Sequence, residues 1–204
     1  PSNTKLLQTN LEFTAGQSGY FNFELRNSKN SRYSKRFNGN ITLNPADANV
    51  KCDIYNKHSS VILVVVKSEK ANTFPNLRES NLELLVESEK VFDLELTIRT
   101  ADLSTAQLLS ENLEGNTLKI NADKELRFSV IGRDEFGNLV VLNPNEAKLK
   151  VKNIKMAKNE LIKESYGRLN YLINTINKNE KRWIVKIVYM DTYVNLTVPK
   201  VVIE

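Results

Sequence analysis

The chain repeats itself once, at a period near the size of a small domain. Residues 11–27 align without a gap with residues 118–134 at a constant offset of 107, and the match resumes between residues 39–45 and 137–144 after an insertion in the first half. A period of this length is too long for a solenoid repeat and is typical of a whole domain in tandem. The matched pairs include Leu11 with Leu118, Ala15 with Ala122, Phe21 with Phe128, Phe23 with Val130 and Arg26 with Arg133.

Apolar and polar residues alternate with period two through both halves. Residues 92–98 show this pattern, and residues 183–189, which we take as their equivalent in the second half, are apolar on both faces. Such patterns predict half-buried strands and a central strand covered on both sides. Seven strands are expected in each half, near 5–13, 19–27, 47–55, 60–67, 80–87, 91–99 and 103–109, and near 116–121, 124–133, 146–154, 157–163, 168–176, 182–190 and 193–203.

Short strands at this spacing predict an all-β fold of two tandem immunoglobulin-like β-sandwiches, each with seven strands. Residues 102–109 fit either a strand or a short helix capped by Asp102, and their match with residues 194–202 favours the last strand of the first domain. Apolar periodicity stops at residues 110–115, where Gly115 allows a bend. We therefore expect domains at 1–112 and 113–204, with Phe21, Phe23, Phe92, Phe128, Val130 and Trp183 in their cores.

Several motifs resemble the filamin-type immunoglobulin-like repeat. These motifs are an Ala-Gly pair, which stands at 15–16 in the first half, then an alternating strand, then Arg-Asp-Glu-Phe-Gly-Asn at 133–138 in the second half. Residues 167–169 and 181–188 resemble the paired strands near the end of such a repeat. The likeness covers nearly all of the second half. The first half keeps the opening but replaces the turn with Arg26, Asn27 and a longer loop. Bacterial immunoglobulin-like surface modules use a similar Asp-x-x-Gly-Asn turn.

The resemblance implies tandem modules of a longer rod-like protein, which bind partners and neighbouring repeats and carry load without catalysis. The turn at 133–138 is closer to filamin-like repeats of protist and plant cell-surface proteins than to animal cytoskeletal filamin. This favours a cell-surface module used in adhesion, as a spacer and for binding other proteins. Two alternatives stay open: an intracellular cytoskeletal or ciliary scaffold, and an accessory domain of an enzyme. Sequons at Asn40 and Asn195 do not settle the compartment, because Asn is abundant throughout the chain.

The sequence offers little for catalysis, metal binding or a cofactor. Cys52 alternates with apolar neighbours and is expected to be a buried thiol, whereas His58 lies in a polar turn and is expected to be exposed. If the chain between them is extended, they are ~20 Å apart, which is too far for a catalytic pair. Asp134 and Glu135 fit a turn that bonds its own backbone better than a calcium loop. We expect no enzyme activity, no metal and no cofactor.

The net charge of the chain and the length of its apolar runs limit which kinds of partner it can have. The net charge of +5 and the pI of about 9.2 describe a basic surface that would favour an acidic protein partner. No nucleic-acid recognition motif accompanies this charge. The longest apolar run, residues 61–66, suits one buried strand, so we expect no membrane insertion by this chain.

Two segments do not repeat, and each has two interpretations. Residues 28–37 form a basic, aromatic insertion that is either a solvated loop or a site for an acidic partner, through Arg32, Tyr33, Lys35, Arg36 and Phe37. Residues 148–158 are rich in lysine, at Lys148, Lys150 and Lys152 among others. In filamin-type repeats this region is a sheet edge that partners extend by β-augmentation. Lysines along an edge also prevent unwanted strand pairing.

Overall fold

The computed structural model describes residues 3–32, 36–111, 113–115, 117–120, 126–152, 158–165, 168–174, 184–189, 192–197 and 200–203. The chain divides into two compact units, unit 1 (Pro1–Ala101) and unit 2 (Asp102–Glu204). Every regular element in the described part is a β-strand, which confirms the predicted all-β class. The described residues contain no helix that could cross a lipid bilayer.

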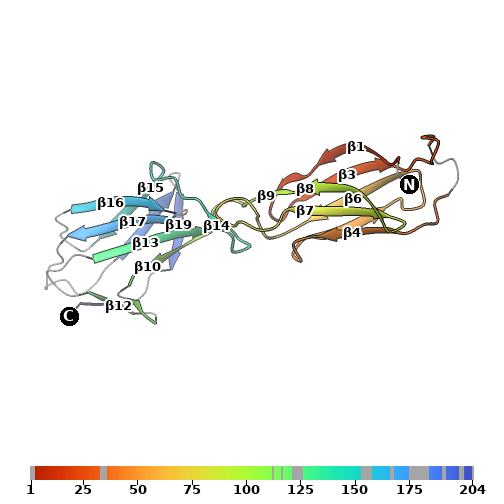
Figure 1. Ribbon diagram of the computed structural model, residues 1–204. Helices are drawn as coiled ribbons and strands as arrows, with labels where there is room; N and C mark the ends of the chain where they lie inside the picture. The colour runs from red at the N-terminus through yellow and green to blue at the C-terminus, as the bar shows by residue number, and fades with distance from the viewer. Residues whose placement is uncertain are drawn as a thin grey trace. The chain divides into compact units, whose positions relative to one another are not determined.

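Unit 1 is a sandwich of two antiparallel sheets. Strands β1, β3, β6 and β5 pair in that order in one sheet, and β4, β7 and β8 form the other. The sheets lie as two layers (Figure 1), with the strand division of a constant-type immunoglobulin domain. A parallel pair, β2 with β9, ties the first part of the unit to its end. The strands are β1 (Lys5–Asn10), β2 (Glu12–Thr14), β3 (Ser18–Glu24), β4 (Ile41–Pro45), β5 (Lys51–Tyr55), β6 (Val61–Lys67), β7 (Asn81–Val86), β8 (Glu89–Glu95) and β9 (Thr97–Arg99).

The core of unit 1 lies between these layers. Because successive side chains of a strand point to opposite faces, every second residue of β3, β6 and β7 faces inward. The inward residues that are 0% exposed are Phe21, Phe23, Ile62, Val64, Val66, Leu82, Leu84 and Val86. The sequence predicted Phe21 and Phe23 correctly, but not β4, which falls in a stretch assigned to no strand.

Unit 2 has corresponding groups of strands, β10-β13-β17-β16 and β15-β18-β19, but a parallel pair, β10 with β19, joins the two groups into one sheet. Its strands run in the order β15-β18-β19-β10-β13-β17-β16, with β14 beside β13 and a separate group β11-β12-β20. Phe128 (3% exposed) and Val130 (0%) are buried as predicted. The strands are β10 (Thr105–Leu109), β11 (Leu113–Glu114), β12 (Thr117–Ile120), β13 (Leu126–Arg133), β14 (Leu139–Val140), β15 (Ala147–Lys152), β16 (Lys158–Ser165), β17 (Arg168–Asn174), β18 (Ile184–Tyr189), β19 (Thr192–Thr197) and β20 (Lys200–Ile203).

The sequence offset of 107 reappears in the strand register. In unit 1, β3 pairs with β6 so that Phe21 lies opposite Val64. In unit 2, β13 pairs with β17 so that Phe128 lies opposite Tyr171, and each of these residues is 107 positions after its counterpart. The parallel pair β2–β9 likewise has its counterpart in β12–β20. The two units therefore share these strand pairings as well as a sequence motif.

The division between the units falls earlier in the structure than the boundary expected at residue 112. Strand β10, expected to end the first domain, pairs with β13 and β19 and is the first strand of unit 2. In unit 1 a single residue separates β1 from β2, whereas in unit 2 the chain between β10 and β12 includes β11. The additional residues of unit 2 lie between β10 and β12. The sequence offset of 107 aligns β12 with β2, but it cannot also align β10 with β1, so it leaves β10 in the first domain.

The proposed equivalence of residues 92–98 and 183–189 is wrong. Strand β18 pairs with β15 and β19, and its counterpart between two neighbours in unit 1 is β7, not β8. Phe92 lies opposite Leu84 on β8, which pairs only with β7 among the described strands of that sheet. It is half-buried because it covers the core from an edge strand. Trp183 lies outside the described residues.

Candidate functional site

Three loops meet at one end of unit 1, and we call this surface the loop end. They are the β3–β4 connection (residues 25–40), the β5–β6 connection (56–60) and the β7–β8 turn (87–88). Backbone hydrogen bonds join them: Leu25 N donates to Ser60 O at 2.8 Å, Phe37 N donates to His58 O at 3.2 Å, and Glu87 N donates to the carbonyl of Asn40 at 3.0 Å. Figure 1 shows β1 starting at the same end.

The β3–β4 loop begins as a small, well-bonded hairpin. The side-chain oxygen of Asn27 accepts hydrogen bonds from Lys29 N and Ser31 N, each at 3.0 Å, and Arg26 and Arg32 form a β-bridge. Asn30 has φ of 60°, a left-handed conformation that asparagine tolerates better than most residues. This part of the insertion is therefore held in one shape by its own polar groups.

A carboxylate joins the two arginines of this hairpin. Arg26 Nε donates to Glu24 Oε1 at 2.8 Å, and Arg32 Nε lies 3.4 Å from Glu24 Oε2. Arg32 Nε also donates to Ser60 Oγ at 2.8 Å, which links the hairpin to the β5–β6 loop. The Glu24 side chain is only 12% exposed, whereas that of Arg32 is 60% exposed. The Glu24 carboxylate is therefore largely buried in this cluster, whereas the Arg32 side chain is exposed to solvent.

Phe37 does not have the exposure expected of a contact residue. It is 6% exposed, and its ring lies where a side chain on Gly39 would have to go, since a Cβ there would be 2.5 Å from Phe37 Cζ. Its carbonyl lies 3.0 Å from His58 Nδ1. Phe37 therefore anchors the loop to the sandwich. Of the other predicted contacts, Arg36 is exposed, and Tyr33 and Lys35 lie outside the described residues.

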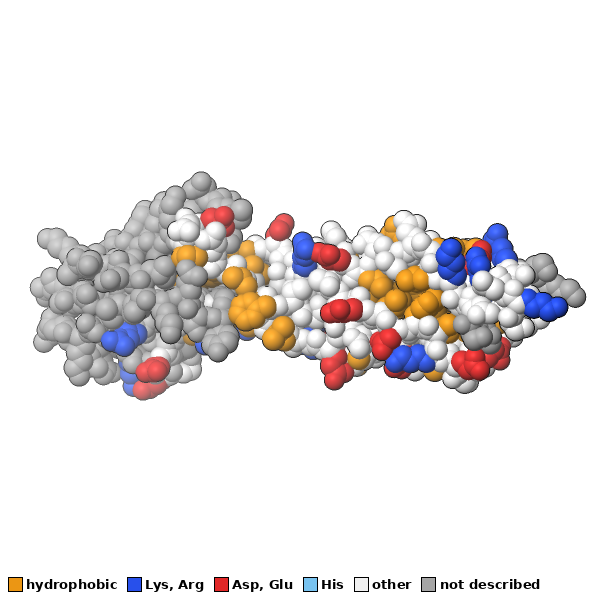
Figure 2. Space-filling view, turned by 45° about the horizontal axis from the view of Figure 1, so that its top comes forward, with side chains coloured by type: hydrophobic (Ala, Val, Ile, Leu, Met, Phe, Trp, Pro, Cys, Tyr) orange, Lys and Arg blue, Asp and Glu red, His pale blue; other side chains and the backbone are white. Residues whose placement is uncertain are grey.

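Basic side chains gather at this end of unit 1, with acidic side chains beside them (Figure 2, right). Its exposed cations come from two loops, and its single loop carboxylate, Glu87, has Oε1 engaged by the backbone N of Asn40 at 3.2 Å. The β5–β6 loop adds Lys57 and the exposed His58, a contribution that no local sequence pattern indicates. The cationic residues of the three loops are Arg26, Lys29, Arg32, Lys35, Arg36 and Lys57.

The lysine-rich segment of unit 2 begins at a sheet edge. Strand β15 ends the strand order of unit 2 and pairs only with β18 among the described strands. Lys148, Lys150 and Lys152 occupy alternate positions along β15. Lys150 pairs directly with Lys186 of β18. The side chains of β15 lie outside what the structure describes.

The turn at 133–138 is built around Asp134. One carboxylate oxygen accepts hydrogen bonds from Phe136 N at 3.0 Å and Asn138 N at 2.8 Å, and the other accepts from Asn138 Nδ2 at 2.8 Å. Asp134 is 3% exposed and Gly137 has φ of 81°. This confirms that Asp134 bonds its own turn. The described residues contain no group of three or more His, Cys, Asp or Glu side chains placed to hold a metal.

The single cysteine and histidine do not form a pair. Cys52 is half-buried on β5 rather than fully buried as expected, because β5 is the edge of its sheet. Burial and, to a lesser degree, the charge of Asp53 raise the pKa of the Cys52 thiol to about 11, which makes the thiol a poor nucleophile at neutral pH. His58 is exposed, as predicted.

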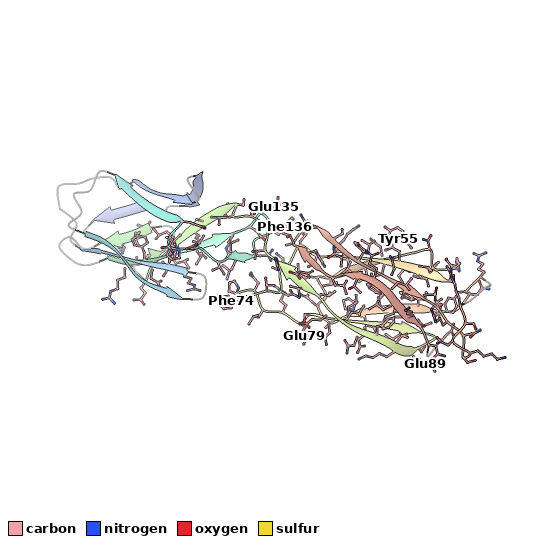
Figure 3. The ribbon with its side chains drawn as sticks, turned by 90° about the horizontal axis from the view of Figure 1, so that it is seen from above. Tyr55, Phe74, Glu79, Glu89, Glu135 and Phe136 are labelled. Carbon is pink, nitrogen blue, oxygen red and sulfur yellow. The ribbon has the colours of Figure 1, made fainter. Side chains whose placement is uncertain are left out.

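The connection between β6 and β7 exposes two large apolar residues that no sequence motif indicates. Phe74 is 54% exposed and Leu77 is 75% exposed. Asn72 fixes this connection, because its Nδ2 donates to Leu96 O at 2.9 Å and its Oδ1 accepts from Ile98 N at 2.7 Å. Figure 3 places Phe74 toward the opposite end of unit 1 from Glu89, so these residues are not part of the loop end.

Comparisons with known proteins identify the fold. No protein-family model and no curated protein matches the chain. Among solved structures, the chain is similar to invasin, a bacterial integrin-binding protein, with a TM-score of 0.53 and 10% identity over 91% of this chain and 36% of invasin. It is also similar to FdeC, an Escherichia coli adhesin, with a TM-score of 0.50 and 10% identity over 95% of this chain and 64% of FdeC. A looser match is the surface layer protein SbsC, domains 4–9, with a TM-score of 0.36, 13% identity, and coverage of 98% of this chain and 31% of that one.

These similarities concern the fold alone. The chain spans about a third of the invasin chain and less than two thirds of the FdeC chain. At 10% identity the shared feature is the sandwich architecture rather than any particular side chain. The all-β sandwich described above is therefore an immunoglobulin-like fold of the kind that these adhesin structures contain.

Proposed function

We propose that the chain is a non-catalytic pair of immunoglobulin-like modules from a larger cell-surface protein, used for adhesion and as a spacer. The observation that carries this proposal is the loop end of unit 1, where loops joined by hydrogen bonds concentrate basic side chains at one end of a sandwich. The fold likeness to an integrin-binding protein and to an adhesin supports the same conclusion. Loops held by a rigid scaffold commonly carry binding.

The contacts of the loop end suit it to an acidic partner. Because Asn27, Glu24 and Ser60 already hold the β3–β4 hairpin, binding would order few further groups, and this lowers the entropic cost of association. Exposed positive charge would also speed encounter with a negative surface, and salt would weaken this attraction.

A triple substitution tests the proposal. Replacing Arg32, Lys35 and Arg36 with Ser should reduce the attachment of cultured animal cells to plates coated with the chain, with little change in melting temperature. The control replaces three cations of unit 1 that lie elsewhere on its surface, Lys51, Lys67 and Arg78, and removes the same charge. Equal attachment by the two triple variants would refute a role for the loop end.

The second candidate is an intracellular scaffold of filamin-type repeats, and its support is the position of β15, which pairs with β18 alone among the described strands. A partner strand added there would run beside Lys148, Lys150 and Lys152, so acidic residues at alternate positions would suit it. An antibody against the chain separates the two functions. Labelling of intact, unpermeabilised source cells supports the surface protein. The scaffold is supported by two results together: labelling only after permeabilisation, and loss of partner binding when Lys148, Lys150 and Lys152 are replaced with Ser.

A further inference from the structure

We infer that the loop end of unit 1 binds a sulfated polysaccharide, with Arg32 as the residue that recognises a sulfate group through two parallel hydrogen bonds. This inference rests on the proposed function and names the chemical class of its partner. It depends on the way Arg32 is held, on the neutralised acids around it and on the surface beside it.

Arg32 is oriented before any ligand arrives. Its Nε is fixed by Ser60 Oγ at 2.8 Å and by Glu24 Oε2 at 3.4 Å. A guanidinium group is planar, so contacts to Nε set the direction of the two terminal nitrogens. Those two nitrogens have no partner among the described residues, and the side chain is 60% exposed. An arginine held in this way can offer a rigid two-pronged donor to a sulfate or carboxylate.

The acids near Arg32 do not cancel its charge toward a ligand. Glu24 is 12% exposed and shares its two oxygens between Arg26 and Arg32. The terminal nitrogen of Arg26 is engaged by the backbone and side-chain oxygens of Asn30, each at 3.3 Å. Around this cluster Lys29, Arg36 and Lys57 are exposed. The cations are spread over two loops, which suits a long polyanion more than a single small ion.

The neighbouring surface favours a sugar over a folded acidic protein. Protein interfaces are usually centred on a few aromatic or arginine anchors. The described residues of the three loops expose no Phe, Tyr or Trp ring, since Phe37 is buried, and arginine is the only anchor type that they present. An open depression lined by residues 54–59 adjoins them, and Tyr55 at its margin is 47% exposed on β5 (Figure 3). A tyrosine ring offers a sugar an apolar face together with a polar tip, and Asn56, Lys57 and Ser59 supply polar groups beside it.

The test measures binding of the whole chain to immobilised heparin. Arg32→Lys keeps the charge but loses the two-pronged donor, so we expect binding to weaken by roughly five- to tenfold. The matched control is Arg36→Lys in the same loop, because Arg36 has no fixing contact among the described residues. It should change binding by less than about twofold. Ser60→Ala, which removes one contact to Nε, should have an intermediate effect.

Three outcomes would overturn the inference: no binding of the wild-type chain to heparin, equal effects of Arg32→Lys and Arg36→Lys, or tighter binding of poly-glutamate than of heparin. The last would identify the partner as an acidic protein segment. Desulfated heparin should bind weakly, since sulfate supplies the charge. If heparin binding is absent but the triple Ser variant still loses cell attachment, the proposed function stands and only the sugar is wrong. If the triple variant attaches normally, the proposed function itself fails.

Discussion

Replacing Asp134 by Ala should destabilise unit 2 by about 2–4 kcal/mol. The substitution removes three hydrogen bonds, from Phe136 N, Asn138 N and Asn138 Nδ2. Asn138 is 5% exposed, so water cannot easily replace its lost acceptor, and a buried donor left unpaired costs about 1–3 kcal/mol. Phe136 is only half-buried and its N–H can be partly rehydrated, which keeps the total near the stated range.

The chain offers a specific reporter and a matched control for this measurement. Its single tryptophan, Trp183, belongs to unit 2, so urea unfolding followed by tryptophan fluorescence reads that unit. Glu135→Ala removes the neighbouring exposed carboxylate of the same turn and should change the unfolding free energy by less than about 0.5 kcal/mol. Calcium and chelator should leave both midpoints unchanged. A cost below about 0.5 kcal/mol for Asp134→Ala, or a midpoint raised by calcium, would refute the structural role of this carboxylate.

Two further predictions concern unit 1. Phe23→Ala should lower the free energy of unfolding by about 3–5 kcal/mol and Phe92→Ala by only about 1–2 kcal/mol, as measured by thermal unfolding followed by circular dichroism. The reason is that the Phe23 ring is fully buried, whereas the Phe92 ring covers the core from an edge strand. Equal losses would contradict this assignment of the core. Because the Cys52 thiol pKa is raised from 9.0 to about 11, the protonated thiol stabilises the folded state below pH 9, and this contribution is lost as the pH rises toward 11. Alkylation of the native chain by iodoacetamide should therefore accelerate with a midpoint near pH 11, and a native midpoint near pH 9 would show that the thiol is exposed.

The sequence alone determined the features that depend on local chemistry and on periodicity. Alternation with period two located nearly every strand, because a strand with one buried face must place apolar residues at every second position. The offset of 107 was preserved in the pairing of β3 with β6 and of β13 with β17, since both halves bury equivalent residues between equivalent strands. The turn at Asp134 was predictable because its hydrogen bonds join residues within the same short segment.

Features that depend on which strands become neighbours were decided by the tertiary structure. Strand β10 has a clear strand pattern, but its assignment to unit 2 follows from pairing with β13 and β19, which lie far along the chain. Phe92 has the composition of a core residue, yet its exposure depends on its place at an edge of the sheet. The same reasoning explains why Cys52, on the edge strand β5, is only half-buried.

The candidate site divides in the same way. Its basic residues could be read from the insertion at 28–37, because charge is a property of composition. The burial of Phe37, the contacts of Arg32 with Ser60 and Glu24, and the addition of Lys57 and His58 all required three loops to meet at one end of a sandwich. Apart from the contact between Arg32 and Glu24, these contacts join residues about 20 to 50 positions apart, and they are set by sheet topology, which no local pattern encodes.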